Sequence, residues 1–383
     1  MSCDIIIPIW NELDFTKDCI NSILLNTKYP FRIIAIDNGS EPDTKKYLDS
    51  VRSERITVIR NEENLGFVKA VNQGLCASTA PYICILNNDT VPAPGWLENM
   101  VRFAEEHPDV GLINPQCSGH GNKPIPEYAS SLEVNRGRYM EMNQCQGFAM
   151  LLRKEVLDKV GYLDEAFGIG GFDDTDYSMR VHKAGYKSVA IGDAYVYHRL
   201  HASFDKAGNR EEWVKRNRKI YYDKWGKHLR AGIILDLSKV RDERLLENAI
   251  LLSYGLAREW TWVHIWVRTN EGKGKIAGIV ENITKKNLLP PHQNIRIEVL
   301  NLPSLILSLT ICGKLIERLR KRMRDKRFDA VISLNKMIPV AVSLSARYVN
   351  AASLNIDVSA VRDWEKKGKE IALYLKNRQK EYA

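Results

Sequence analysis

The most chemically informative segment of the sequence is Asn87-Asn88-Asp89, which directly follows a short apolar run at residues 83–86. A continuous apolar run of this length is typical of a strand that is buried on both faces of a parallel sheet. In open α/β sheets, ligands bind at the carboxyl ends of the strands. A carboxylate flanked by amides at such a place suits a divalent cation that carries phosphate oxygens. An ordinary Asx turn, which requires no ligand, is the alternative interpretation.

A second cluster of polar groups lies further along the chain. Asp173, Asp174 and Asp176 follow a glycine-rich segment at 168–171. Acidic residues at a helix start are favoured by the helix dipole and can cap its free N–H groups. Capping accounts for about one of the three carboxylates, so the cluster exceeds what a helix requires. His198 follows a further predicted strand, where an ordinary polar role is the alternative to a ligand role.

The first 90 residues alternate between apolar runs and helical patterns. Four runs are expected to be strands, and they lie at residues 5–9, 31–36, 55–59 and 83–86. Helical spacing of apolar residues is clearest between the first two runs, at 11–26. This alternation is the βαβ pattern of a nucleotide-binding half-sheet. Neither GxGxxG nor GxxxxGK(S/T) occurs, which argues against a dinucleotide fingerprint and against a P-loop.

Taken in their order and spacing, seven segments within residues 3–205 resemble the family 2 glycosyltransferases, which have the GT-A fold. The segments are IIIPIWN (5–11), IDNGSEPD (36–43), NLGFVKAVNQGL (64–75), LNNDTVPAPGWL (86–97), QGFAMLLRKEVLDKVGYLDEAF (146–167), GGFDDTDYSMR (170–180) and VYHRLHAS (196–203). The fourth segment is similar to that of the rhamnosyl- and galactofuranosyl-transferase-like branch. The resemblance implies an α/β nucleotide-diphospho-sugar transferase fold, with a mostly parallel central sheet, in residues 1–230.

The resemblance assigns donor-binding roles to residues of the first strand–helix units. Pro8 and Trp10 would border the nucleotide base, and Asp37 would accept a hydrogen bond from it. Asn64 and Gly66 would line the base and the ribose. The implied donor is a UDP- or dTDP-sugar.

The same resemblance places Asn87-Asn88-Asp89 where the family has its DxD motif. Asn87 replaces the first acid, so contact with the donor ribose is expected there while direct metal ligation is weakened. Asp89 keeps the metal-ligand position, and His198 matches a family histidine that can complete the site. The implied cofactor is Mn²⁺ or Mg²⁺, which would neutralise the charge that develops on the departing diphosphate.

Asp173 and Asp174 match the acid pair that precedes the acceptor helix in the family, and Asp174 is the expected general base. An acceptor hydroxyl must lose a proton as it attacks, and a positioned carboxylate that accepts this proton is typically worth about 10²–10⁴ in rate. With base and leaving group on opposite faces of the sugar, a single displacement inverts the anomeric centre. We therefore expect an inverting transferase that acts on a glycan or a lipid-linked acceptor.

A chain of 383 residues is expected to form two domains. Residues 1–230 hold 29 basic and 31 acidic side chains, a net charge of −2, whereas residues 231–383 hold 27 and 16, a net charge of +11. Strands are expected in the second half at 233–237, 262–267, 295–300, 330–334 and 351–356. This alternation loosely resembles one Rossmann-like half of a GT-B enzyme, without a glycine loop or acid cluster. We predict a smaller, basic, Rossmann-like α/β accessory domain that is not catalytic.

Two basic stretches are candidates for contact with a partner. Residues 314–327 carry eight positive and two negative charges. A solvated helix is one interpretation; the others are contact with an anionic membrane or lipid-diphosphate acceptor, and contact with a nucleic-acid backbone. Residues 213–225 combine basic and aromatic side chains, which either hold an acceptor near the active site or pack the two domains together.

The sequence favours a cytoplasmic location. Peripheral contact with the inner face of a membrane is a further possibility that it leaves open. Seven cysteines are scattered without CxxC spacing, which indicates reduced thiols rather than disulfides or a zinc site. No apolar run reaches the roughly 18 residues that a membrane span requires. The apolar run at 5–9 is too short for the core of a signal peptide.

Three alternatives remain open from the sequence. The basic second half motivates a variant in which the sugar is transferred to hydroxymethylated DNA. Asn87 in place of an acid motivates a non-catalytic scaffold that binds sugar nucleotides or glycans. A nucleotidyltransferase that makes the sugar nucleotide would require a basic phosphate loop after the first strand, where Asn11-Glu12-Leu13-Asp14 is acidic instead.

Overall fold

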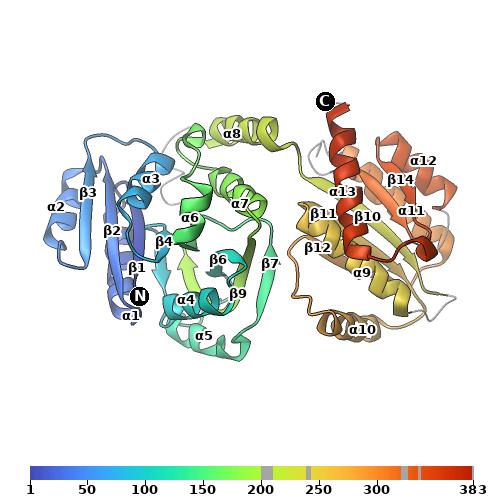
Figure 1. Ribbon diagram of the computed structural model, residues 1–383, viewed down its shortest axis with the longest axis horizontal. Coiled ribbons are helices and arrows are strands. Elements are labelled where there is room, and N and C mark those ends of the chain that lie inside the picture. Colours follow the sequence, from blue (N-terminus) through green and yellow to red (C-terminus); the bar gives the residue numbers. More distant parts are fainter. Residues whose placement is uncertain (200–209, 239–242, 321–326, 335–337, 382–383) are drawn as a thin grey trace. The chain divides into compact units, whose positions relative to one another are not determined.

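The chain folds into two compact units (Figure 1), of which the first comprises Met1–Lys224 and the second Trp225–Ala383. The computed structural model describes residues 1–199, 210–238, 243–320, 327–334 and 338–381. Within these ranges, no helix combines the length and the apolar character that crossing a bilayer requires.

The first unit begins with the expected strand–helix alternation. Strands β1 (Cys3–Ile9), β2 (Phe31–Asn38), β3 (Ile56–Asn61) and β4 (Tyr82–Leu86) pair in parallel in the order β3-β2-β1-β4. Helices α1 (Leu13–Asn26), α2 (Pro42–Ser50) and α3 (Phe67–Ala77) connect them. Ile5, Ile6 and Ile7 are all fully buried, so both faces of β1 are covered, as its continuous apolar run predicts. The carboxyl ends of these four strands therefore share one edge of the sheet.

The remaining strands make this sheet mixed rather than mostly parallel. β8 (Ala149–Arg153) pairs antiparallel with both β4 and β6 (Val110–Gln116), and β9 (Lys187–His198) pairs parallel with β6. β5 (Thr90–Pro92) and β7 (Tyr139–Met142) add antiparallel to β9. The helices of this part are α4 (Trp96–Glu106), α5 (Ile125–Ser131), α6 (Lys154–Val160), α7 (Asp173–Lys183) and α8 (Arg210–Trp225). Because β5 pairs with the end of β9, the segment after β4 is held beside His198.

The second unit contains a five-stranded sheet in which every pairing is parallel. Its strands are β10 (Leu229–Asp236), β11 (Thr261–Arg268), β12 (Ile295–Leu300), β13 (Ala330–Ser333) and β14 (Ala352–Asn355), in the order β12-β11-β10-β13-β14. Helices α9 (Glu243–Arg258), α10 (Lys273–Lys286) and α13 (Trp364–Glu381) pack on one face, and α11 (Ser304–Arg320) and α12 (Val340–Tyr348) on the other. This arrangement confirms the prediction of a second, parallel α/β sheet.

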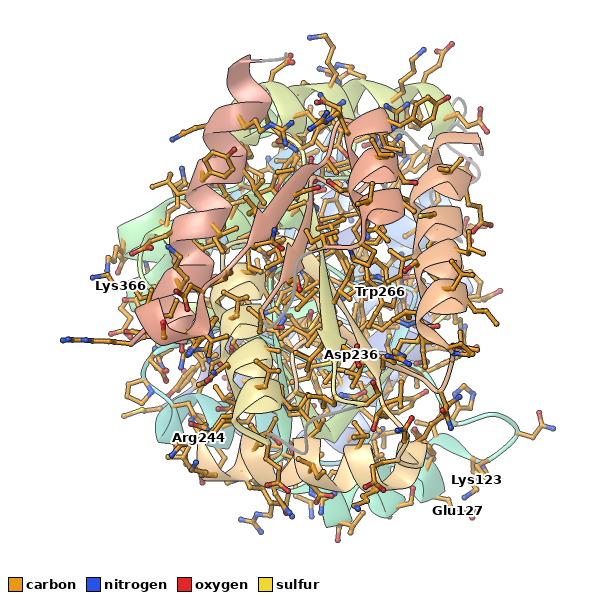
Figure 2. All side chains as sticks on the ribbon, turned by 90° about the vertical axis from the view of Figure 1, so that its right-hand side faces the viewer. Lys123, Glu127, Asp236, Arg244, Trp266 and Lys366 are labelled. Atoms are coloured by element: carbon orange, nitrogen blue, oxygen red, sulfur yellow. The ribbon has the colours of Figure 1, made fainter. Side chains whose placement is uncertain are left out.

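Side chains fill both faces of the second sheet (Figure 2). Trp266 is fully buried on the side of α11 and α12, where its ring lies 5.3 Å from that of Phe328. At the carboxyl end of β10, Asp236 pairs with Arg268 at 3.1 Å and accepts a hydrogen bond from the hydroxyl of Ser238 at 2.6 Å. The carboxylate of Asp236 is therefore bonded to side chains of its own unit.

Candidate active site

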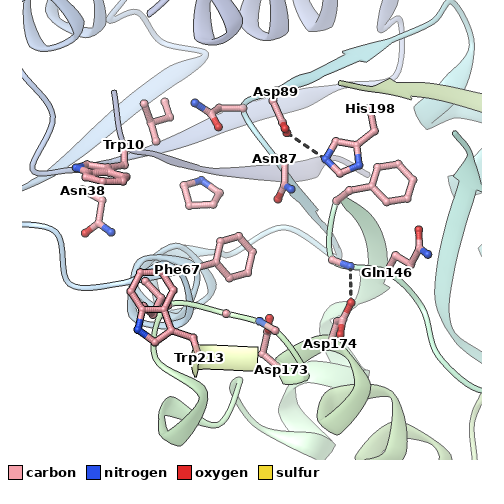
Figure 3. Close-up of a pocket in the computed structure, with 18 of the residues that line it drawn as sticks. Trp10, Asn38, Phe67, Asn87, Asp89, Gln146, Asp173, Asp174, His198 and Trp213 are labelled. Atoms are coloured by element: carbon pink, nitrogen blue, oxygen red, sulfur yellow. Dashed lines mark hydrogen bonds and ion pairs between the residues drawn. The ribbon is translucent and has the colours of Figure 1, made fainter. Parts of the chain in front are cut away.

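The carboxyl edge of the first sheet opens into a cavity of about 420 Å³ (Figure 3). It lies beyond the ends of β1 and β4, which is where ligands bind in open α/β sheets. The starts of α3 and α7, the end of β9 and part of α8 complete its wall. Its lining includes Pro8, Trp10, Asn38, Asn64, Phe67, Asn87, Asn88, Asp89, Gln146, Phe148, Asp173, Asp174, His198 and Trp213.

All of the predicted site residues except Asp37 and Gly66 line this cavity. Asp89 and His198 lie on one side of it, and Asp173 and Asp174 lie on the opposite side (Figure 3). The structure thus brings together two clusters that are about 85 residues apart in the chain.

Asp89 and His198 form a pair that secondary structure holds together. The pairing of β5 with β9 places Thr90 opposite His198, and the backbone carbonyl of Asp89 accepts a hydrogen bond from the N–H of Arg199 at 3.1 Å. The Nε2 atom of His198 lies 3.2 Å from Oδ1 of Asp89. The imidazole also stacks on the ring of Phe148, with centroids 5.1 Å apart. Both side chains are therefore positioned by the sheet.

The donor atoms around Asp89 suit a hard divalent cation. The side-chain oxygen of Asn87 and Oδ1 of Asp89 are both buried without a hydrogen-bond partner, and the latter lies 3.2 Å from Nε2 of His198. Among the residues that the structure describes, no three His, Cys, Asp or Glu side chains gather into a metal cluster. A cation here would have these few protein ligands and would take the others from a diphosphate and water, as Mg²⁺ commonly does. Asn88 is engaged elsewhere, since its amide donates to the hydroxyl of Thr16 at 3.0 Å.

Asp173 and Asp174 begin α7 on the other side of the cavity. Asp173 accepts a hydrogen bond from the N–H of Gly171 at 2.6 Å, and Asp174 accepts from the N–H groups of Gly147 at 3.2 Å and Thr175 at 2.7 Å. Burial raises the pKa of Asp173 to about 7, and the neighbouring charge of Asp174 adds to the shift. Burial also raises the pKa of Asp174, which its N–H donors partly offset. The pair can therefore accept a proton near neutral pH, as a general base must.

Asp37 does not reach the cavity, and its neighbour Asn38 lies on the wall instead. Asp37 is fully buried; one of its oxygens pairs with Nε of Arg60 at 2.8 Å, and the other accepts from the N–H of Ser40 at 3.0 Å. Asn38 donates through Nδ2 to Oδ1 of Asn64 at 2.8 Å. Both oxygens of Asp37 are thus used inside the protein. Asn38 and Asn64 line the cavity, and the oxygen of Asn38 accepts hydrogen bonds from Asn61 and from the N–H of Leu65.

Gly66 shapes the wall without lining the cavity. Its φ is +88°, and a Cβ atom at this position would lie 3.0 Å from the carbonyl oxygen of Gly168. That carbonyl accepts a hydrogen bond from the N–H of Val68 at 3.0 Å, and the carbonyl of Gly66 accepts one from Asn38 at 3.2 Å. Glycine therefore allows α3 to start close against the segment that leads to Asp173.

Removal of Arg60 is expected to destabilise the protein by about 3 kcal/mol, because the buried carboxylate of Asp37 would lose its cation. For Arg60→Ala we expect a lower urea midpoint at pH 7. Arg52→Ala is the matched control, since Arg52 pairs with Asp49 at 3.2 Å and both side chains are about half exposed. Such a surface pair contributes at most about 1 kcal/mol. Equal midpoints for the two variants would contradict a structural role for Asp37.

Two residues of α8 contribute to the site, within the stretch 213–225 for which the sequence left open either an acceptor-holding role near the active site or packing between the two domains. Trp213 lines the cavity near Phe67 (Figure 3). Asn217 is fully buried, and its Nδ2 donates to three carbonyl oxygens of the segment 167–171 at distances of 2.8 to 3.1 Å. It thereby fixes the glycine-rich segment that leads to Asp173. The aromatic content of 213–225 is a signal for Trp213, whereas nothing local marks Asn217.

Comparison with known proteins finds relatives that match part of the chain. Residues 4–161 match the family model described as "Glycosyl transferase family 2". The uncharacterized protein y4gI of Sinorhizobium fredii is 26% identical over 250 residues, which cover 58% of this chain and 27% of that protein. Glycosyltransferase GlyG of Streptococcus pneumoniae is 22% identical over 263 residues, which cover 64% of this chain and 86% of GlyG. The chain thus spans about a quarter of the length of the first relative and most of the second.

Among solved structures, the chain is similar to the mannosyltransferase PcManGT from Pyrobaculum calidifontis, which was determined in complex with GDP-Man and Mn²⁺. The two share 18% sequence identity with a TM-score of 0.42, over 53% of this chain and 58% of that one.

Proposed function

The N-terminal part of this chain belongs to glycosyl transferase family 2, and from this premise we propose that the chain moves a sugar from a nucleoside-diphosphate sugar to an acceptor hydroxyl, with inversion at the anomeric carbon. One observation carries the proposal: a single cavity has the two kinds of group that the reaction requires. Asp89 and His198 on one side offer ligands for the cation of a diphosphate. Asp174 on the other side offers a base.

The proposed reaction forms one bond and breaks one. The acceptor oxygen attacks the anomeric carbon, its proton passes to a carboxylate oxygen of Asp174, and the bond from that carbon to the diphosphate oxygen breaks. The diphosphate leaves with the electron pair of that bond. Asp89, His198 and Asn87 would hold Mn²⁺ or Mg²⁺, which would neutralise the charge on the leaving diphosphate. Inversion follows because base and leaving group lie on opposite faces of the sugar.

We assign the nucleotide of the donor to the part of the cavity near Trp10. Trp10 and Pro8 border the base, and the ribose lies towards Asn64. Asn38, rather than the buried Asp37, lies beside the base on the cavity wall. A UDP- or dTDP-sugar is the proposed donor. The likeness of segment 86–97 supports the rhamnosyl- and galactofuranosyl-transferase-like branch as the finer assignment.

The proposed acceptor is a glycan or a lipid-linked sugar that enters beside Trp213. Residues 1–230 are the proposed catalytic domain, and residues 231–383 a basic accessory domain without a catalytic role. A cytoplasmic location is supported by the seven cysteines, all of which are free thiols.

A thermal-shift panel of UDP- and dTDP-sugars, each measured with and without Mn²⁺, tests this proposal. At about 100 times its Kd, a donor stabilises the folded protein by roughly 2.7 kcal/mol, which raises the midpoint of a unit of this size by about 5–10 °C. Sugar phosphates that lack the nucleoside are the control and are expected to give no shift. A panel in which no nucleotide sugar raises the midpoint would contradict the proposal.

A non-catalytic scaffold that binds sugar nucleotides is the second candidate. It is favoured by Asn87, which stands where the family carries its first acid. Turnover separates the two candidates. A transferase hydrolyses or transfers its preferred donor in the presence of Mn²⁺, whereas a scaffold binds the donor and leaves it intact.

A further inference from the structure

Helices α11 and α12 of the second unit lie side by side on one face of its sheet (Figure 1). Six of their large apolar side chains are between 47% and 74% exposed. These six form what we call the apolar face, and they are Leu305, Ile306, Leu309, Val340, Leu344 and Tyr348.

The apolar face is additional to the stripe that each helix buries against the sheet. Leu307, Ile311 and Leu315 are buried on α11 with a spacing of four residues, whereas Leu305 and Leu309 repeat the same spacing on the exposed side. The inner stripe is sufficient to attach the helix to its own core. Several large exposed apolar side chains on two adjacent helices indicate a surface that contacts something outside the fold.

The sequence around the apolar face is strongly basic. Residues 304–313 and 340–346, which carry most of the face, contain no charged side chain. Residues 304–350 as a whole contain ten Lys and Arg against three Asp and Glu. The second unit, residues 225–383, contains 29 against 16, a net charge of +13. An uncharged apolar strip within a basic segment is typical of helices that lie in a membrane interface.

We propose that the apolar face docks the second unit onto the surface of an anionic lipid bilayer. The six apolar side chains enter the boundary between head groups and acyl chains, and the net positive charge of the second unit attracts the anionic head groups. A second copy of the chain is a poorer occupant, because it would bring two units of net charge +13 together. The proposal does not depend on the donor or on the chemistry of the first unit.

Vesicle binding by the full chain tests the docking proposal. We expect it to bind vesicles of phosphatidylcholine mixed with phosphatidylglycerol, and to bind vesicles of phosphatidylcholine alone much more weakly. The double variant Leu309→Glu, Leu344→Glu is expected to lower the partition into anionic vesicles by about ten-fold or more, because it places carboxylates where apolar groups enter the bilayer.

The matched control is the double variant Leu288→Glu, Leu373→Glu. Leu288 and Leu373 are 89% and 60% exposed, lie in the second unit outside the apolar face, and undergo the same change of charge. This control is expected to keep its vesicle binding within about two-fold. Thermal midpoints of both double variants, measured without lipid, establish that they are folded.

Three outcomes would overturn the docking proposal. The first is that the unaltered chain stays in the supernatant with anionic vesicles at low salt. The second is an equal loss of binding in the two double variants, which would make net charge the cause. The third is a dimer, detected by light scattering without lipid, that Leu309→Glu, Leu344→Glu dissociates, which would assign the apolar face to a second copy.

Discussion

The Asp174→Asn variant is expected to transfer sugar about 10²–10⁴-fold more slowly than the unaltered chain, with its affinity for the donor unchanged. The amide keeps the shape of the side chain and an acceptor oxygen, but it cannot take the proton of the acceptor hydroxyl. The N–H groups of Thr175 and Gly147 donate to different oxygens of the carboxylate, so the amide oxygen can keep the bond from Thr175 and gives up the bond from Gly147. A thermal midpoint close to that of the unaltered chain would establish that α7 still starts in the same place. The measurement is kcat at saturating donor, with donor affinity taken separately from the thermal shift.

The same pair of carboxyl groups determines the expected pH dependence. Burial raises the pKa of Asp173 to about 7, the charge of Asp174 adds to this, and burial raises the pKa of Asp174 as well. Below about pH 7 the pair therefore holds a proton, whereas an ordinary aspartate stays deprotonated down to about pH 4. Transfer is accordingly expected to decline as the pH drops through the region near 7.

Asp173→Asn is the matched variant for this pH effect. It removes the negative charge beside Asp174, so the acid limb is expected to move to lower pH while transfer is retained. A raised pKa in the folded state means that the pair's stabilising contribution is complete at low pH and is lost as the pH rises through about 7. Asp173→Asn should therefore have a higher thermal midpoint than the unaltered chain above pH 7. A greater loss of transfer in Asp173→Asn than in Asp174→Asn would make Asp173 the base.

The position of the candidate site in the fold could be predicted from the residues at which the apolar runs end. The runs that became β1 and β4 stop at polar or turn-forming residues, and parallel strands bring their carboxyl ends to one edge. Trp10 and Asp89 could therefore be expected in one cavity from the chain alone. The antiparallel addition of β8 escaped prediction, because strand direction depends on pairing between distant segments.

Pairing between distant segments also explains why Asn38, and not the predicted Asp37, lines the cavity. Successive side chains along a strand point to opposite faces, so only one of the two neighbours can face the cavity. Cross-strand pairing places Arg60 opposite Asp37 and Asn61 opposite Asn38. The choice is therefore made by a partner 23 residues away, which no local pattern reveals.

Long-range contacts also explain why Asn217 and the apolar face were not predicted. Asn217 acts on carbonyl groups that lie 46 to 50 residues earlier in the chain. For α11, periodicity indicates that apolar residues form stripes, but it does not say which stripe the sheet covers. In both cases the missing information is tertiary packing.

The Asp89→Ala variant is expected to lose the Mn²⁺-dependent part of donor binding and to transfer sugar about 10²–10³-fold more slowly. Asp89 supplies the carboxylate among the metal ligands proposed here, and His198 and Asn87 carry no negative charge to replace it. In the proposed arrangement the nucleoside part of the donor lies near Trp10 and away from Asp89, so binding of UDP without metal is expected to remain. Electron paramagnetic resonance of Mn²⁺ with UDP present measures the bound metal directly, independently of turnover.

Asp18→Ala is the matched control for Asp89→Ala. Asp18 pairs with Arg199 at 2.7 Å, directly after His198 in the chain, and its side chain is about half exposed. Because it does not line the cavity, removal of its charge tests whether a nearby acid is enough to change metal binding. We expect Asp18→Ala to bind Mn²⁺ with UDP like the unaltered chain. If both variants lost bound Mn²⁺ equally, the loss would come from the overall electrostatic field of the protein. If Asp89→Ala still bound Mn²⁺, the metal would have to be held by other residues.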